Sequence, residues 1–299
     1  MGEPASYMPT AAPGGAGARA RRKPRGLLRR LLTNPLSSAG LILVCIAVVV
    51  AVLAPEIAPF NPVAMVPQDR LLPPSAAHWF GTDDGGRDIL SRIIYGTRSS
   101  LLTALGILAM ASILGTVVGL VAGSCSGWID EMLMRITDMF LAFPALVLAM
   151  GLAATLGPSL FNAMIATALV WWPWYARLVR GQTLQLNHEA FVEAARIAGA
   201  SPIRIAIHHI LRNCLTPIIV QMSLDIGYAI LTLASLSFIG LGAQPPTPEW
   251  GSMVSIGRDY FLDQWWMVTF PGLAIFISVM AFNLLGDGLQ EALSPRLRR

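Results

Sequence analysis

Four long stretches of this sequence contain no Asp, Glu, Lys or Arg, and they constrain the possible fold more than any other feature. They cover residues 36–55, 99–129, 139–176 and 265–286. About 20 apolar residues in a helix are enough to cross the hydrocarbon core of a bilayer. The composition agrees, because 13% of the residues are charged, against about a quarter in an ordinary soluble domain. The chain is therefore predicted to lie in a membrane.

The number of spans follows from the lengths of these stretches. The third is long enough for two crossings, and Gly157-Pro158-Ser159 in its middle predicts the break between them. A further apolar segment, 215–241, is interrupted by one charge, Asp225. We expect an all-α polytopic membrane protein with six transmembrane helices, near residues 36–56, 99–124, 132–156, 160–180, 215–241 and 266–288.

The basic residues predict the orientation of these spans. With the N-terminus inside, sixteen of the 21 Lys and Arg residues fall on inner segments, so the positive-inside rule places both termini and the 181–214 loop in the cytoplasm. Residues 1–30 are predicted to be a disordered, basic cytoplasmic tail, and residues 31–299 one transmembrane domain. Basic clusters beside a span orient it or meet anionic lipid, so the expected surface partner is the lipid bilayer and not nucleic acid.

The residues that common nucleotide and catalytic motifs require are missing. The single lysine, Lys23, lies between Arg22 and Pro24, whereas a Walker A loop needs Gly-Lys-Ser/Thr to reach nucleotide phosphates. The four histidines show no His-Glu-x-x-His spacing, and no Gly-x-Ser-x-Gly elbow accompanies them. The sequence thus predicts no catalytic residue, no metal site and no cofactor in this chain, and it favours a transport subunit over an enzyme.

Several side chains inside or beside the spans have predicted roles. Asp225 is expected to face a cavity or another subunit, because an intramembrane charge is costly. Arg135 and Asp138 are predicted to form an ion pair on one helix face. Three glycines four residues apart predict close packing of two helices; they are Gly115, Gly119 and Gly123. Four aromatic residues before Arg177 predict a belt at the membrane–water interface; they are Trp171, Trp172, Trp174 and Tyr175.

The outer loop at 57–98 carries Asp83, Asp84, Arg87 and Asp88 around Gly85-Gly86. Such a group predicts a turn with side-chain-to-backbone hydrogen bonds. Calcium binding is the alternative, although the loop lacks the ligand order of an EF-hand. A structural or docking loop is therefore favoured.

A polar hairpin is predicted between the fourth and fifth spans, over residues 189–213. A first helix ends at Gly199, which suits the left-handed position after a helix. Ser201 and Pro202 are good starting residues for a second helix, whose apolar stripe is Ile203, Ile207, Ile210 and Leu211. Small residues on the first arm allow it to settle in a groove of another protein.

The segment "EAARIAGASPIRIAIHHILRN" resembles the EAA loop of permeases from ATP-binding cassette (ABC) importers. Glu193, Ala194, Ala195, Gly199 and Leu211 match its pattern, whereas His209 and Arg212 stand where the pattern has Ile and Pro. Three further stretches are similar to the dipeptide, oligopeptide and nickel branch of these permeases, and the chain as a whole resembles the C-type subunits of dipeptide permeases. The stretches are "GTDDGGRDILSRIIYGTRSSLL", "MRITDMFLAFPALVLA" and "GLGAQPPTPEWGSM".

The resemblance implies a type I ABC importer permease fold in the bacterial inner membrane. Its implied partners are a second permease in a heterodimer, two cytoplasmic ATPase subunits that bind ATP and Mg, and an extracytoplasmic binding protein. The implied ATPase-coupling residues are Glu193, Ala194, Ala195, Gly199, Ala200 and Leu211, and the implied binding-protein contacts are Asp83, Arg87, Asp88, Glu249 and Trp250. Asp225 is the candidate on the translocation path.

The resemblance leaves the substrate open among dipeptides, short oligopeptides, glutathione, nickel chelates and opines. Some stretches, such as "LLPPSAAHWFGTD", are most similar to permeases for D,D-dipeptides. An ion-coupled secondary transporter and a membrane-embedded enzyme are the alternative classes.

Overall fold

The computed structural model describes residues 31–125 and 127–293, and in that part of the chain the regular structure is helical, with one isolated bridge between Thr82 and Asp88. The all-α prediction is confirmed. The predicted tail, residues 1–30, lies outside the described residues. The helices are α2 (Pro35–Ile57), α3 (Ile89–Ser124), α4 (Trp128–Leu141), α5 (Ala145–Leu156), α6 (Leu160–Leu186), α7 (Ala190–Ile197), α8 (Pro202–Arg204), η2 (Ile205–Leu211), α9 (Arg212–Phe238), α10 (Trp250–Gly257) and α11 (Trp266–Leu293), with short η1 (Pro67–Asp69) and η3 (Arg258–Tyr260).

Four helical segments of the described chain are long and apolar enough to cross a membrane on their own: Pro35–Ile57, Ile89–Ser124, Pro202–Phe238 and Trp266–Leu293. The pair α4 and α5 passes the same test when the two helices are taken together. The predicted break at 157–159 is confirmed, because α5 ends at Leu156 and α6 begins at Leu160.

A second break, which the sequence analysis missed, divides the expected span 132–156. The chain bends by 90° between α4 and α5, where Pro144 stands immediately before α5. Proline disfavours the helical conformation of the residue before it and ends many helices there. The run of uncharged residues concealed this break, since Phe143 and Pro144 are themselves apolar.

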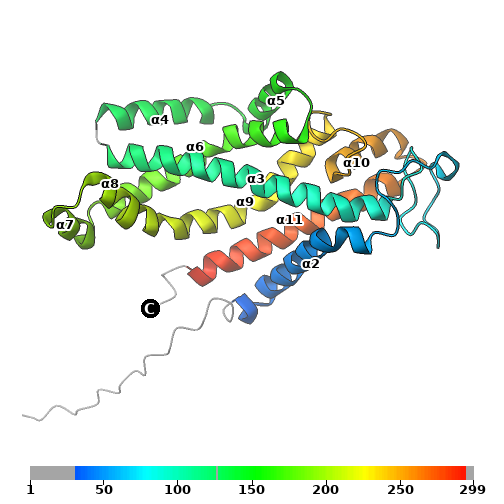
Figure 1. Ribbon diagram of the computed structural model, residues 1–299, viewed down its shortest axis with the longest axis horizontal. Helices are drawn as coiled ribbons and strands as arrows, with labels where there is room; N and C mark the ends of the chain where they lie inside the picture. The colour runs from blue at the N-terminus through cyan, green and yellow to red at the C-terminus, as the bar shows by residue number, and fades with distance from the viewer. Residues whose placement is uncertain (1–30, 126, 294–299) are drawn as a thin grey trace, which may run out of the picture.

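The helices lie roughly along one long axis (Figure 1). The α7–α8 hairpin stands at one end of this axis, and the loops between α2 and α3, together with α10, lie at the other end (Figure 1). Helix α2 begins and α11 ends on the hairpin side of the molecule (Figure 1). The fold thus separates a hairpin end from an end built of loops.

Packing of α3 against α6 organises the centre of the bundle. A Cβ added to Gly115 would lie 2.5 Å from both the Trp172 carbonyl oxygen and the Tyr175 Cβ, and one added to Gly123 would lie 2.6 Å from the Thr183 Cβ. The glycines therefore let the two backbones approach, as the spacing predicted.

Candidate coupling hairpin and intramembrane cavity

The first arm of the hairpin is α7, in which one residue is buried and most of the others are exposed. Val192 is fully buried, whereas Glu193 and Ala194 are exposed and Ala195 is half-buried. Glu193 has no ion-pair partner among the described residues of this chain. An acidic side chain in the first turn of a helix is favoured by the helix dipole, so Glu193 stabilises α7 while remaining accessible.

The turn after α7 has the geometry expected from its sequence. Gly199 has a φ of +80°, in the left-handed region that glycine adopts at little cost. Its backbone N–H donates to the Arg196 carbonyl, and that of Ala200 donates to the Ala195 carbonyl. The Ser201 hydroxyl then accepts from the Arg204 N–H at 3.4 Å and caps α8. The predicted helix-turn-helix is confirmed in its first half.

The second arm differs from the prediction. A π-helical segment, η2, joins α8 to α9, so the arm continues into the membrane span as one helical segment, Pro202–Phe238. Ile205 and Ile210 are its buried residues, and they are five apart, which is the spacing of π-helical hydrogen bonds. Of the predicted apolar stripe, Ile210 is buried and Leu211 is half-buried, whereas Ile203 and Ile207 are exposed.

The hairpin rests on the transmembrane bundle through one apolar cluster. Val192, Ile205 and Ile210 pack together with Tyr175 and Val179 of α6, and Ala200 lies at the edge of this cluster. Leu211 is half-buried, and the side chain of Asn213 donates to the His209 carbonyl at 2.6 Å. The second arm is therefore anchored to both α6 and α9.

The outer end contains a buried polar network. The Asp83 Oδ1 accepts from the backbone N–H groups of Gly85 and Arg87, and its Oδ2 accepts from Arg87 Nε at 2.7 Å. Asp88 caps α3 at the Ser91 N–H and contacts His78 Nδ1 at 3.0 Å. The predicted turn with local side-chain-to-backbone hydrogen bonds is confirmed.

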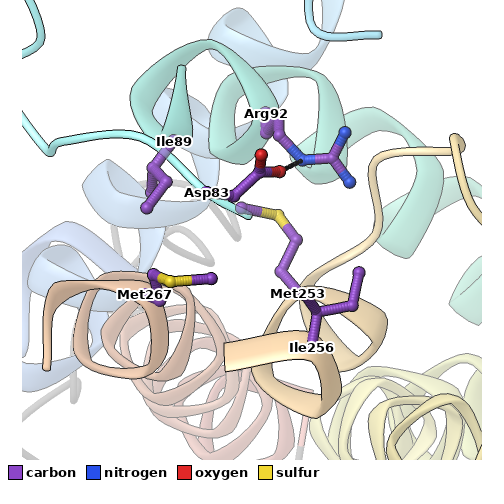
Figure 2. Close-up of a pocket in the computed structure, with 6 residues that line it drawn as sticks. All are labelled: Asp83, Ile89, Arg92, Met253, Ile256 and Met267. Carbon is purple, nitrogen blue, oxygen red and sulfur yellow. Dashed lines mark ion pairs between the residues drawn. The ribbon is translucent and has the colours of Figure 1, made fainter. Parts of the chain in front are cut away.

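Arg92, which the sequence analysis did not select, connects the two outer loops. Its Nη1 donates to the Pro62 carbonyl at 2.8 Å and to the Pro246 carbonyl at 3.3 Å, and its Nε lies 3.4 Å from Asp83 Oδ2. Figure 2 shows Asp83 and Arg92 above Met253 and Met267. These four residues help to line a cavity of about 10 Å³, which has room for about one water molecule.

Glu249 and Trp250 start α10 beneath these loops. The Glu249 carboxylate accepts from the N–H groups of Gly251 and Ser252, both at 2.9 Å. Burial raises the pKa of Glu249, while these two hydrogen bonds oppose the shift. Trp250 Nε1 donates to the Ile93 carbonyl of α3 at 3.1 Å. Both side chains thereby fix the position of α10.

The five outer-loop candidates, Asp83, Arg87, Asp88, Glu249 and Trp250, are all buried within this chain. Their charged groups and the ring nitrogen of Trp250 form hydrogen bonds or ion pairs with other groups of this chain. In the part of the chain that the structure describes, no group of three or more His, Cys, Asp or Glu side chains is arranged to hold a metal ion.

Asp225 belongs to α9, contacts α6 through Tyr175 and lines a cavity of about 770 Å³. Its Oδ2 accepts from the Tyr175 hydroxyl at 2.8 Å, and its Oδ1 accepts from Gln221 Nε2 at 2.9 Å. Trp171, Trp174 and Tyr228 form the aromatic wall of the same cavity. The predicted aromatic belt was thus wrong for Tyr175, which is fully buried, and for Trp172, which is 6% exposed.

Two ion pairs near the hairpin end also differ from expectation. Asp138 pairs with Arg177 at 2.6 Å and Arg135 pairs with Glu131 at 3.3 Å. The predicted Arg135–Asp138 pair was wrong, because α6 brings a second arginine to Asp138.

Fold and sites together define a helical membrane protein with a hairpin at one end and, between its helices, a largely apolar cavity that contains the Asp225 carboxylate. A family model described as "Binding-protein-dependent transport system inner membrane component" matches residues 115–299, and one described as "N-terminal TM domain of oligopeptide transport permease C" matches residues 25–74. The chain belongs to this family of inner-membrane permease subunits of ABC importers.

Named relatives cover nearly the whole chain. It is 48% identical over 270 residues, 90% of this chain and 91% of the relative, to the "Probable D,D-dipeptide transport system permease protein DdpC" of Escherichia coli (strain K12). It is 46% identical over 92% of its length, and 90% of the relative, to a "Dipeptide transport system permease protein DppC" of Alkalihalophilus pseudofirmus. A "Glutathione transport system permease protein GsiD" of Pectobacterium atrosepticum is 43% identical over 92% of this chain and 91% of the relative.

Proposed function

We propose that this chain is one of two permease subunits that together form the translocation path of an importer for dipeptides or short oligopeptides. Two ATPase subunits supply the energy, and an extracytoplasmic binding protein delivers the peptide. The printed names of relatives at 46–48% identity support the peptide class, and the relative named for glutathione, itself a short peptide, is compatible with it.

The observation that carries this proposal is the exposed apolar surface on both sides of the hairpin turn. Ile197 is 83% exposed and Ile203 is 72% exposed. They belong to α7 and α8, the two helices that stand at one end of the bundle (Figure 1). Exposed apolar groups rimmed by polar residues are typical of protein interaction sites. With Glu193, they offer an ATPase subunit apolar contacts and one anchoring charge.

The path from this surface to the cavity is short and continuous. Ile205 and Ile210 tie the hairpin to α6, and the same helical segment continues through η2 into α9, which carries Asp225. A displacement of the hairpin therefore moves the wall of the cavity. In this proposal the partner ATPase subunits bind ATP and Mg, and this chain takes part in transport alone.

We place six spans in the membrane: α2, α3, the bent pair α4–α5, α6, α9 with its preceding turns, and α11. We count α6 as the sixth span because it packs against α3 along the face that carries Gly115, Gly119 and Gly123. Both termini then lie on the cytoplasmic side with the hairpin, and residues 31–299 form one transmembrane domain.

At the outer end, we propose that the binding protein docks on the loops whose shape the buried polar network maintains. Asp83, Arg87, Asp88, Glu249 and Trp250 set the shape of these loops from inside. Contacts with the partner then come from exposed residues of the same region, of which Leu262, 94% exposed, and Trp79, 68% exposed, are examples.

Reconstitution tests this proposal. The four-subunit membrane complex in proteoliposomes, with its binding protein, is expected to accumulate a labelled dipeptide only when ATP is supplied. Uptake by this chain alone along a proton gradient would instead identify a secondary transporter. The ligand that co-purifies with the binding protein separates dipeptides from glutathione, nickel chelates and opines.

A further inference from the structure

Asp225 is a carboxylate without a cation in the middle of the bundle. Both of its oxygens accept hydrogen bonds, from the Tyr175 hydroxyl and the Gln221 amide, a pattern that suits the ionised carboxylate. Both donors are neutral, and Asp225 has no ion pair within the described residues. Intramembrane charges normally pair with another charge or mark the path of a substrate or ion.

The nearby arginines are committed elsewhere. Arg177 lines the same cavity, but its Nη2 lies 2.6 Å from Asp138 Oδ1. Arg180, one turn further along α6, makes two hydrogen bonds to Asp130, at 2.6 and 2.7 Å. Both oxygens of Asp225 still have lone pairs free for a third partner, and among the described residues no cation takes that place.

The rest of the cavity suits a small amphipathic ligand. Its volume, about 770 Å³, falls in the range of small-molecule sites. Trp171, Trp174 and Tyr228 line the cavity, and aromatic rings both attract cations to their faces and pack against apolar groups. Trp174 and Tyr228 are 59% and 64% exposed, so the cavity is open on their side.

We infer that this cavity is a peptide-binding site within the translocation path, in which Asp225 holds the α-ammonium group of the peptide. Tyr175 and Gln221 orient the carboxylate, and the three aromatic side chains receive the peptide's apolar parts. The inference rests on the proposed function, and it adds a recognition step inside the membrane after the binding protein has released its ligand. The site selects peptides with a free amino terminus.

The direct test measures binding to the complex of permeases and ATPases without its binding protein. Saturation-transfer NMR titrations compare alanyl-alanine with N-acetyl-alanyl-alanine. We expect alanyl-alanine to bind the wild type, to bind Asp225→Asn at least about ten-fold more weakly, as for a lost charged hydrogen bond, and to bind Tyr175→Phe with an intermediate affinity. The acetylated peptide should bind weakly and equally to all three.

A matched control is Glu131→Gln, which removes the same charge from an exposed ion pair with Arg135 and should leave binding unchanged. The inference is overturned by equal affinity of alanyl-alanine for the wild type and Asp225→Asn. It is also overturned if the wild type binds no peptide while Asp225→Asn weakens the permease pair, since a side chain of the partner permease would then fill the cavity.

Uptake separates this inference from the proposed function. If the wild type takes up the dipeptide and Asp225→Asn does so equally well with unchanged binding, only the peptide site is refuted. If the wild-type complex shows no ATP-driven dipeptide uptake, the proposed function itself fails. We expect Asp225→Asn to retain the ATP hydrolysis that the loaded binding protein stimulates while its uptake falls, because the hairpin is untouched.

Discussion

Replacing Gly199 should uncouple ATP hydrolysis from uptake without unfolding the hairpin. At φ +80°, an L-residue is strained by about 1–2 kcal/mol, least for Asn and most for a β-branched residue. Apart from its two chain neighbours, none of the described residues has a heavy atom within 4 Å of a Cβ added there, so among these residues the cost is conformational and not steric.

The remaining contacts of the hairpin exceed this strain. Val192, Ile205 and Ile210 are buried, and burial of each contributes about 1.5–3 kcal/mol. The hairpin should therefore stay docked on α6, while the native turn conformation loses about 5–30-fold in population relative to alternatives. Only the surface that we propose meets the ATPase then changes shape.

The assay is the ratio of dipeptide taken up to ATP hydrolysed in proteoliposomes. We expect this ratio to fall in the order wild type, Gly199→Asn, Gly199→Ala, Gly199→Val. Gly181→Ala is the control, because Gly181 lies inside α6 with ordinary helical geometry and open space around it. If crowding of a partner mattered more than the turn, Ala would be tolerated better than Asn, and a wild-type ratio in Gly199→Val would refute the reasoning.

Three further predictions concern stability, measured by thermal unfolding of the purified complex. Gly119→Leu should destabilise it by about 1–3 kcal/mol, because the new side chain would run into the Ala176 carbonyl and Val179 of α6, whereas Gly151→Leu, with open space around it, should not. Asp130→Asn should lower the unfolding temperature more than Glu131→Gln, since Asp130 makes a two-bond pair with Arg180 that is partly buried and Glu131 an exposed one; equal effects would contradict this. Because burial raises the pKa of Glu249 above 4.5 in the folded state, its contribution to stability is full below about pH 4.5 and is lost as the pH rises through the folded value. Glu249→Gln should flatten that part of the pH profile, and an unchanged slope would argue against the shift.

The sequence predicted the features that depend on local pattern. Uncharged runs gave the long helices, Gly157-Pro158-Ser159 gave one break, and Gly199 with Ser201 gave the hairpin turn. These succeed because apolar length, glycine conformation and helix capping act over a few residues. The glycine spacing in α3 also predicted close packing, although not that α6 is the partner.

The errors in side-chain partners and in burial share a physical cause, which is tertiary contact between distant segments. The ion-pair partner of Asp138 is Arg177, 39 residues away, and the Tyr175–Asp225 hydrogen bond joins residues 50 apart. Burial of Asp83 and Glu249 depends on how two loops meet around Arg92. The π-helical period of Ile205–Leu211 was also missed, because the hydrophobic pattern was interpreted with the commoner α-helical period.

The most direct test of the account is ATP-dependent uptake of a labelled dipeptide by proteoliposomes that contain the complete importer. We predict accumulation that requires ATP, the binding protein and an intact Gly199 turn, together with no uptake by this chain alone. Accumulation driven by a proton gradient in vesicles that contain only this chain would contradict it.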